Sequence, residues 1–469
     1  MRAALAIASA LLLSACQTWS PDGGMNVVAD IVGHDLNKDV VALRTPEETQ
    51  AARARVRVLL RRPLTADAAV RIALLNNRGL QAAYNELGLA EAAMVQASLP
   101  SNPTFSLSRV STSIEIEIER RIVADILALA SLPARAEIAA DRFWQAQLRA
   151  AEETLRVAAE TRRAFYRAVA ARELGGLLEQ AKSAAETATE LARRLGETGA
   201  MNKLDQAREQ VFYAEVTAQL ATARQRAASE RERLTRLMGL WGGDLDFNLP
   251  DALPALPPPK ALPAIETEAV RRRVDLQVAR IELNALAKSY GLANATRFIN
   301  LLEVSGISKT QREADGARGS GGGVEVEFQL PIFDFGEVRV RQSEQTYMQA
   351  LNRLVERAVN VRSEARDAYR NYRSTYDIAR HYRDEVVPLR KIISDEMILR
   401  YGAMQIDVFA LLAEARQRIT SSVSAIEARR EFWLAHTDLS VAVVGGGPSG
   451  TNEASRAMAA GSAEPGGRH

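Results

Sequence analysis

Few residues of this 469-residue chain could support covalent or metal chemistry, and those few lie far apart. None of the histidines has a partner at the spacing of a zinc site; they are His34, His381, His436 and His469. The run Gly321-Gly322-Gly323 precedes a predicted strand and does not join a strand to a helix, so it is no phosphate-binding loop. The sequence therefore predicts neither an enzyme nor a cofactor nor a bound metal.

The single cysteine, Cys16, follows a short apolar segment, Ala3 to Leu13, that begins after one basic residue. A basic start, a short apolar run and small residues before a cleavage point are typical of a secretory signal peptide, here residues 1–15. A cysteine at that point is the lipobox pattern, so we expect lipid, such as palmitate, on Cys16. Gln17 is not the aspartate associated with retention at the inner membrane. The alternative is an ordinary signal peptide with a chance cysteine; in either case the mature chain forms no disulfide.

Bulk composition excludes some partners. Lys plus Arg is 60 and Asp plus Glu is 58, so the charge gives no reason to expect nucleic acid as a partner. Aromatic residues make up 5% of the chain, and its interior is rich in alanine, which suits long, closely packed helices. Beyond the signal peptide, no segment reaches the roughly 18 apolar residues of a membrane-spanning helix.

Two segments alternate apolar and acidic residues. In the first, isoleucines separate Glu115, Glu117 and Glu119, and in the second, Val324, Val326 and Phe328 flank Glu325 and Glu327. A period of two predicts strands with one apolar and one acidic face. Such strands suit a sheet with lipid on one side and water on the other. We expect these five glutamates to line a pore and to favour cations; the alternative is a merely solvated face.

The elements around these strands occur twice in the same order, as helices, a β-hairpin and a long helical hairpin. At an offset of 203, Arg163, Tyr166 and Arg167 match Arg366, Tyr369 and Arg370, and Gly199-Ala200-Met201 matches Gly402-Ala403-Met404. The predicted organisation begins with a lipidated N-terminal segment at 16–63. The first repeat, at 64–248, contains a β-hairpin at about 104–122 and a helical hairpin at about 133–239, and a Pro-rich linker follows at 249–263. The second repeat, at 264–444, contains a β-hairpin at about 298–331 and a helical hairpin at about 336–443, and a disordered tail follows at 445–469.

Local signals set the expected limits of these elements. Thr65 is a predicted helix N-cap, Asn76-Asn77 a break between helices, and Gly199 and Gly402 the ends of long helices. Pro388 is expected to interrupt the long helix predicted between about Gly336 and Gly402. The glycines at 319–323 are expected to form a loop before the last strand.

This arrangement resembles the TolC family of outer-membrane efflux proteins, and its lipidated branch in particular. The resemblance covers nearly the whole mature chain, from about Leu64 to Val443. It rests on Leu64-Thr65 leading to Ala69 and Ala73-Leu74, Leu99-Pro100 with Asn102-Pro103, Leu330-Pro331-Ile332-Phe333-Asp334 with Gly336, and the turns Gly199 to Asp205 and Gly402 to Asp407. The resemblance implies a mainly α-helical chain with a small membrane β-barrel part, assembled as a trimeric tunnel of strands and helices.

Physical reasoning points the same way, because four strands cannot close a barrel and an open sheet edge in lipid leaves backbone groups unsatisfied. We therefore expect a homotrimer in the bacterial outer membrane that extends into the periplasm. Its implied role is the passive exit duct of a tripartite efflux system, with a periplasmic adaptor and an inner-membrane pump as partners. A type I protein secretion duct is the alternative within this class, and a periplasmic adaptor or coiled-coil scaffold is the alternative outside it.

The ends of the helical hairpins hold the remaining candidate residues. We expect Gly199-Ala200-Met201 and Gly402-Ala403-Met404 to meet the adaptor, against the alternative that they are only turns. Met201 and Met404 suit soft copper, but one methionine per tip is no site, so ordinary packing is favoured. By resemblance, Asp407 matches the first of two aspartates around the periplasmic aperture, and Ala410 occupies the second position. Helix capping is an equal interpretation for Asp407 and the favoured one for Asp205.

Overall fold

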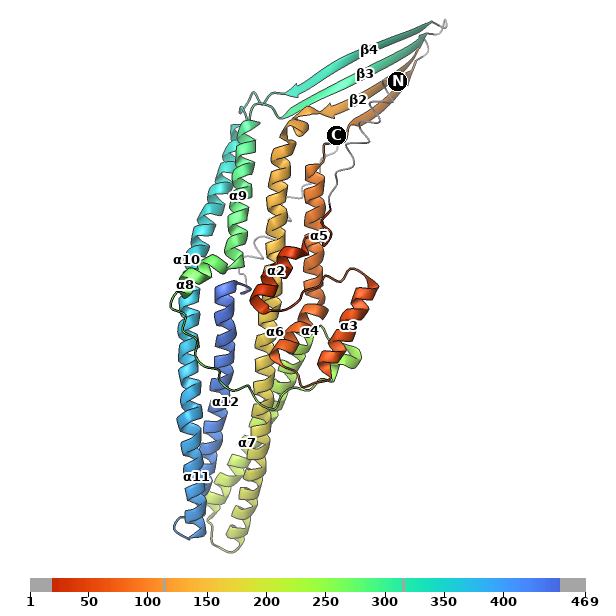
Figure 1. Cartoon of the computed structure of the whole chain (residues 1–469). Coiled ribbons are helices and arrows are strands. Elements are labelled where there is room, and N and C mark those ends of the chain that lie inside the picture. The colour runs from red at the N-terminus through yellow and green to blue at the C-terminus, as the bar shows by residue number, and fades with distance from the viewer. Residues whose placement is uncertain (1–18, 113–114, 314–316, 448–469) are drawn as a thin grey trace. The chain divides into compact units, whose positions relative to one another are not determined.

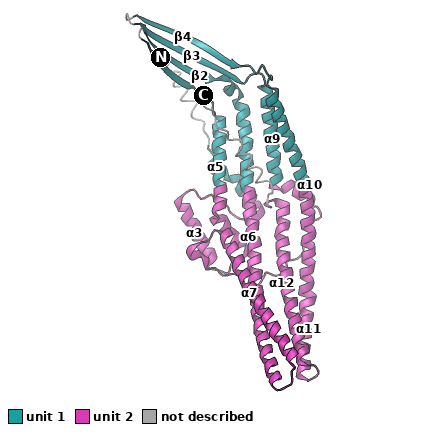
Figure 2. Cartoon of the chain, turned by 180° about the vertical axis from the view of Figure 1, so that it is seen from behind, with its two compact units in different colours: residues 1–28, 84–150, 275–358 teal, residues 29–83, 151–274, 359–469 magenta. Residues whose placement is uncertain are grey.

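The computed structural model describes residues 19–112, 115–313 and 317–447. The chain divides into two compact units, shown in Figure 2. Unit 1 comprises residues 1–28, 84–150 and 275–358, and unit 2 comprises 29–83, 151–274 and 359–469. Each unit therefore takes segments from both predicted repeats. Cys16 and the predicted signal peptide lie outside the described residues, as does most of the predicted tail.

Unit 1 contains one antiparallel sheet in the order β1-β2-β3-β4 (Figure 1). The strands are β1 (Thr104–Ser111), β2 (Glu115–Asp125), β3 (Leu301–Glu313) and β4 (Arg318–Gln329). Each repeat supplies one hairpin, and β2 pairs with β3 to join them. The expectation of a glycine-rich loop at 319–323 was wrong, because these glycines lie within β4 and pair with β3. Pairing with a neighbouring strand outweighed the weak intrinsic preference of glycine for strands.

The first hairpin is longer than its sequence pattern suggested. Strand β2 continues to Asp125, and helix α6 (Ile126–Glu197) follows without a loop. The Oδ1 atom of Asp125 accepts the backbone N–H of Ala128 at 2.8 Å, which caps the start of the helix. The helix thus begins at 126, not at about 133, and Pro133 lies inside it. As the eighth residue of α6, Pro133 lies beyond the first turn and cannot donate the hydrogen bond to the carbonyl of Leu129, so it weakens the helix locally.

The second hairpin returns to helix through a tight turn at Gly336. Its φ is +71°, and a Cβ atom there would lie 2.1 Å from the carbonyl oxygen of Arg297. Only glycine fits that approach. Helix α10 (Glu337–His381) then begins, and α9 (Val274–Ala295) precedes β3 in the same way that α5 (Arg78–Ser98) precedes β1. The glycine of the Leu330–Gly336 motif is thereby explained.

Unit 2 is helical, and its two antiparallel pairs are the predicted helical hairpins (Figure 1). The first pair is α6 with α7 (Lys203–Met238), and the second is α11 (Val387–Gly402) with α12 (Val408–Val444). The π-helical segment η2 (Tyr382–Val386) separates α10 from α11 directly before Pro388, which confirms the expected interruption. The shorter elements are α2 (Met25–Leu36), α3 (Pro46–Leu60), α4 (Ala66–Asn76), the 3₁₀ turn η1 (Gly242–Leu245) and α8 (Ile265–Arg272).

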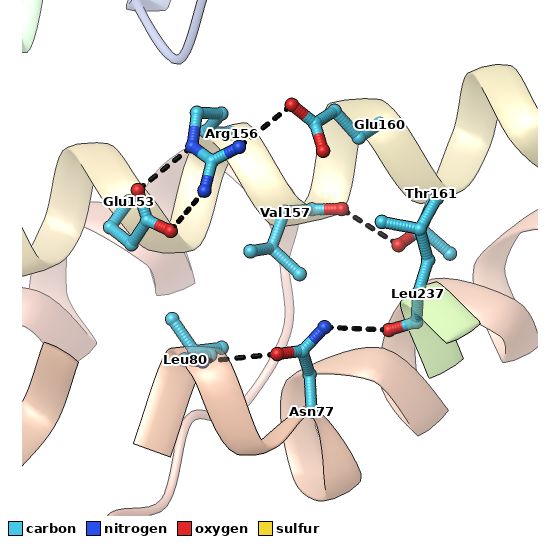
Figure 3. Close-up of polar contacts among 8 residues, drawn as sticks. All are labelled: Asn77, Leu80, Glu153, Arg156, Val157, Glu160, Thr161 and Leu237. Atoms are coloured by element: carbon cyan, nitrogen blue, oxygen red, sulfur yellow. Dashed lines mark hydrogen bonds and ion pairs between the residues drawn. The ribbon is translucent and has the colours of Figure 1, made fainter. Parts of the chain in front are cut away.

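Polar contacts fix where the short helices of unit 2 meet the long ones. Asn77, at the break between α4 and α5, donates from Nδ2 to the carbonyl of Leu237 at 2.8 Å, and its Oδ1 accepts the N–H of Leu80 (Figure 3). The same figure shows Arg156 of α6 held between Glu153 and Glu160. Thr65 caps α4 as predicted, accepting the N–H of Ala68. The core of this unit combines alanines of α6, such as Ala164 and Ala168, with larger side chains such as Phe165, Leu234 and Met238.

Candidate functional site

The register of the sheet places the predicted acidic residues on one face. Glu119 lies opposite Ser108 on β1 and Lys309 on β3, and Glu325 lies opposite Ser305. All five predicted glutamates share this parity. We call this side the polar face. Its polar residues include Ser106, Ser108, Glu115, Glu117, Glu119, Arg121, Glu303, Ser305, Lys309, Gln311, Glu325 and Glu327, and the same side also carries Gly321, Gly323 and a few apolar residues, Val110, Val123 and Ile307.

Two basic residues of the polar face are tied to its carboxylates. Lys309 Nζ lies 3.2 Å from Glu117 and 3.0 Å from Glu119, and Arg121 lies 3.2 Å from Glu325. Sequence reasoning missed both bases and also Glu303. The signal in β3 was a polar residue at every second position from 303 to 313, with Ile307 as the exception, and Gly306, Ser308 and Thr310 on its other face obscured it.

Carboxylates still outnumber bases on the polar face. Glu303 lies directly opposite Glu327, and neither forms an ion pair with any described residue. Like charges in directly opposite positions destabilise a sheet. Water and mobile counter-ions relieve that repulsion, so this pair indicates that the polar face is in contact with water.

The opposite side of the sheet, called here the apolar face, exposes large hydrophobic side chains. Phe105 is 62% exposed, Val324 77% and Phe328 58%. They share the face with Leu107, Ile116, Ile118, Ile122, Leu302, Val304 and Val326. Exposed apolar surface of this extent indicates contact with lipid or with another protein surface.

The two hairpin tips have equivalent sequences but different structures. At the first tip, Gly199 has a φ of +74°, Asn202 caps α7, and Met201 is only 4% exposed. Asn202 therefore does what was expected of Asp205, whose own backbone N–H donates to the Asn202 side chain at 2.9 Å. Packing is confirmed for Met201.

At the second tip the left-handed residue is Met404, with a φ of +58°, and not Gly402. The Asp407 carboxylate accepts the N–H of Ala410 at 2.8 Å and so caps α12. The capping residue Asp407 follows Gly402 by five residues, whereas Asn202 follows Gly199 by three, so the second turn is longer. Met404 is 93% exposed, and the packing interpretation is wrong for it.

Comparison with known structures matches most of the chain to one class of protein. CusC superposes with a TM-score of 0.67 at 16% identity, over 84% of this chain and 92% of its own. The CmeC outer membrane channel of Campylobacter jejuni has a TM-score of 0.66 at 17% identity, over 90% of this chain and 92% of its own. The outer membrane protein VceC of Vibrio cholerae has a TM-score of 0.67 at 15% identity, over 86% of this chain and 100% of its own.

The chain has the fold of the TolC-like outer-membrane channels. No protein-family model matches the sequence, and no curated protein resembles it at the sequence level. Recognition therefore rests on structure, which at such low identities shows the fold. The predicted class, mainly helical with two hairpins of strands and long helical hairpins, is confirmed.

Within this TolC-like fold, a half-buried ion pair links the two helical hairpins. Glu209 of α7 is 4% exposed, and its Oε1 accepts from Arg416 Nη2 of α12 at 2.6 Å. The Arg416 guanidinium also lies over the ring of Phe212, 4.5 Å from its centre. Removal of Arg416 would leave the buried Glu209 carboxylate without its partner, so this contact links α7 to α12.

The described residues contain no group of acidic, histidine or cysteine side chains that could hold a metal ion. His436 is buried against Tyr372 and Phe432, and that burial lowers its pKa to about 4, so it is neutral at physiological pH. Among the described helices, none combines the length and apolarity needed to cross a membrane.

Proposed function

We propose that this chain is the outer-membrane exit duct of a tripartite efflux system. In this role it is a passive conduit for substrates delivered by an inner-membrane pump through a periplasmic adaptor. The observation that carries the proposal is a four-stranded sheet with one acidic face, one apolar face and two unpaired edges within a TolC-like fold. Closure of such sheets from several protomers satisfies the edges and encloses the acidic faces in a water-filled lumen.

The strand lengths fit a membrane crossing. Strands β2, β3 and β4 have 11, 13 and 12 residues, and only β1, with 8, is shorter than the roughly 9–11 residues that a tilted strand needs. Phe333, at the end of the sheet where α10 begins, is 99% exposed. An exposed aromatic ring at this level suits the membrane–water interface on the periplasmic side. A periplasmic adaptor or scaffold would have no use for such a face.

Lipid on Cys16 is part of the proposal. Ser20 donates its backbone N–H to Glu91 of α5 at 2.7 Å, and Glu91 is buried, which fixes the chain to unit 1 just after the lipidation position. Four extended residues reach about 14 Å at most, so the lipid would insert near the unit that carries the sheet. In Cys16→Ser, we expect loss of fatty-acid labelling and of normal cleavage of the signal peptide. Unchanged labelling and processing would refute lipidation without touching the channel assignment.

Conductance tests the channel function itself. Reconstituted in planar bilayers, the protein should open water-filled pores that prefer cations, because carboxylates exceed bases on the polar face. In the double variant Glu325→Gln, Glu327→Gln this preference should fall toward equality of cation and anion permeability. The matched control, Arg121→Gln, removes a base from the same face and should raise the preference. An anion-selective wild type, or protein that opens no pores, would contradict the proposal.

A further inference from the structure

Four arginines interrupt the apolar face. The register places Arg109, Arg120, Arg312 and Arg318 on the same side as Phe105 and Phe328. All four are exposed, and we call them the arginine band. A charge on a lipid-facing sheet surface is costly near the middle of a bilayer and nearly free at its interfaces. Their positions along the strands therefore matter.

Arg109, Arg312 and Arg318 lie in the half of the sheet away from the helices, and Arg120 lies near the middle of its strand. Leu302 and Phe328 are paired at the end nearest α9 and α10, and Arg312 and Arg318 are paired at the other end of the same two strands. Ten residues separate the two pairs along β3, or about 33 Å at ~3.3 Å per residue. With a strand tilt of roughly 40°, that is a height of about 25 Å, equal to the apolar band of a membrane β-barrel.

The described contacts distinguish these arginines from the bases of the polar face. Arg121 and Lys309 are paired with glutamates, whereas Arg109, Arg312 and Arg318 form no ion pair with any described residue. Arg120 lies opposite Ser308, yet its Nη1 contacts the Thr310 hydroxyl at 3.4 Å, one step further toward the free end of the sheet. Its side chain thus extends away from the apolar half, as an arginine does when it reaches for an interface.

We infer that the arginine band binds the phosphate groups of lipids in the outer leaflet of the membrane. The inference rests on the proposed channel function, which sets the apolar face against lipid and the strand turns outside. A guanidinium group forms paired hydrogen bonds to phosphate oxygens, and a lipid phosphate would supply the negative charge that the apolar face lacks. Such contacts fix the height of the barrel in the membrane and favour a leaflet rich in phosphorylated headgroups.

The test uses the purified full-length channel in detergent, titrated with lipid A or with lipid A stripped of its phosphates, with bound lipid counted by native mass spectrometry. The test variant carries Arg109→Gln, Arg120→Gln, Arg312→Gln and Arg318→Gln. The control carries the same charge change on exposed helical arginines: Arg53→Gln, Arg57→Gln, Arg226→Gln and Arg233→Gln. We expect wild type and control to prefer phosphorylated lipid A by roughly tenfold or more, and the test variant to lose that preference.

Three results would overturn the inference: equal binding of both lipids by the wild type, an unchanged preference in the test variant, or an equal loss in the control, which would indicate general charge attraction. Inorganic phosphate that competes as well as lipid A would show binding of free anions only. Conductance in neutral phosphatidylcholine bilayers separates this inference from the channel proposal, because the test variant should still open pores there.

Discussion

Replacing Ala403 with tryptophan is expected to abolish export, and replacing Ala200 to reduce it, while the protein stays folded and assembled. Both alanines are exposed at the hairpin tips, where substitutions usually cost under about 0.5 kcal/mol of stability. If the tips contact the adaptor, the indole ring separates the two surfaces, and the duct is cut off from its pump. The readouts are efflux in cells, cross-linking to the adaptor, and yield of assembled protein.

The structure makes the second tip the stronger candidate. Met404 is exposed and holds a left-handed backbone conformation, which costs energy for any residue but glycine. We therefore expect Ala403→Trp to be more damaging than Ala200→Trp. Ala221→Trp, at an exposed position along α7 away from the tips, is the matched control and should export normally. Full efflux and cross-linking in both tip variants would show that the tips are only turns.

The second large effect concerns the edges of the sheet. Within the described part of the chain, β1 and β4 each pair on one side only, so a row of backbone N–H and C=O groups on each is left without a partner. Such a row costs several kcal/mol per group in a membrane. Because β4 is antiparallel to β1, the β4 edge of one protomer can pair with the β1 edge of the next, and the ring closes.

Engineered cysteines report that pairing. Ser108 on β1 and Gly321, Gly323 and Glu325 on β4 belong to the polar face, so one pair among Ser108→Cys with Gly321→Cys, Gly323→Cys or Glu325→Cys should oxidise to a covalent ring of protomers. Ser108→Cys with Val324→Cys is the control, because Val324 belongs to the apolar face and the two thiols would lie on opposite sides of the sheet. Equal cross-linking of the control would mean that the edges do not pair in register.

Much of the fold could be predicted from the sequence because its signals were local. The glutamates of β2 and β4 alternate strictly with apolar residues, so parity alone placed them on one face. Thr65 begins a helix by capping it with its side chain, and Gly199, which has no side chain, follows the end of another helix with a positive φ. The helices α2 and α3 were missed. Helix α2 is short and has no acidic residue in its first turn, whereas α3 has few apolar positions and its available signal was the capping box of Thr45 and Glu48.

The ion pairs of the polar face and of the helical hairpins could not be predicted, because each depends on a partner distant in sequence. Lys309 meets Glu117 and Glu119 only once β2 pairs with β3, and Arg416 meets Glu209 only once the two hairpins pack. The exact sequence repeat also suggested equivalent tips. The tips differ because their helix caps lie at different positions. The cap is Asn202 at the first tip and Asp407 at the second, so the second turn is longer and places Met404 in the left-handed conformation.

The mass of the purified particle in detergent, measured together with its β-structure, tests the central claim most directly. The account predicts a homotrimer that resists dissociation, because each protomer's open sheet depends on its neighbours for closure. The particle should therefore have three times the mass of the mature chain and a circular dichroism spectrum that includes the strands. A stable monomer with its β signal intact would show that the sheet needs no partner, and the duct described here could not form.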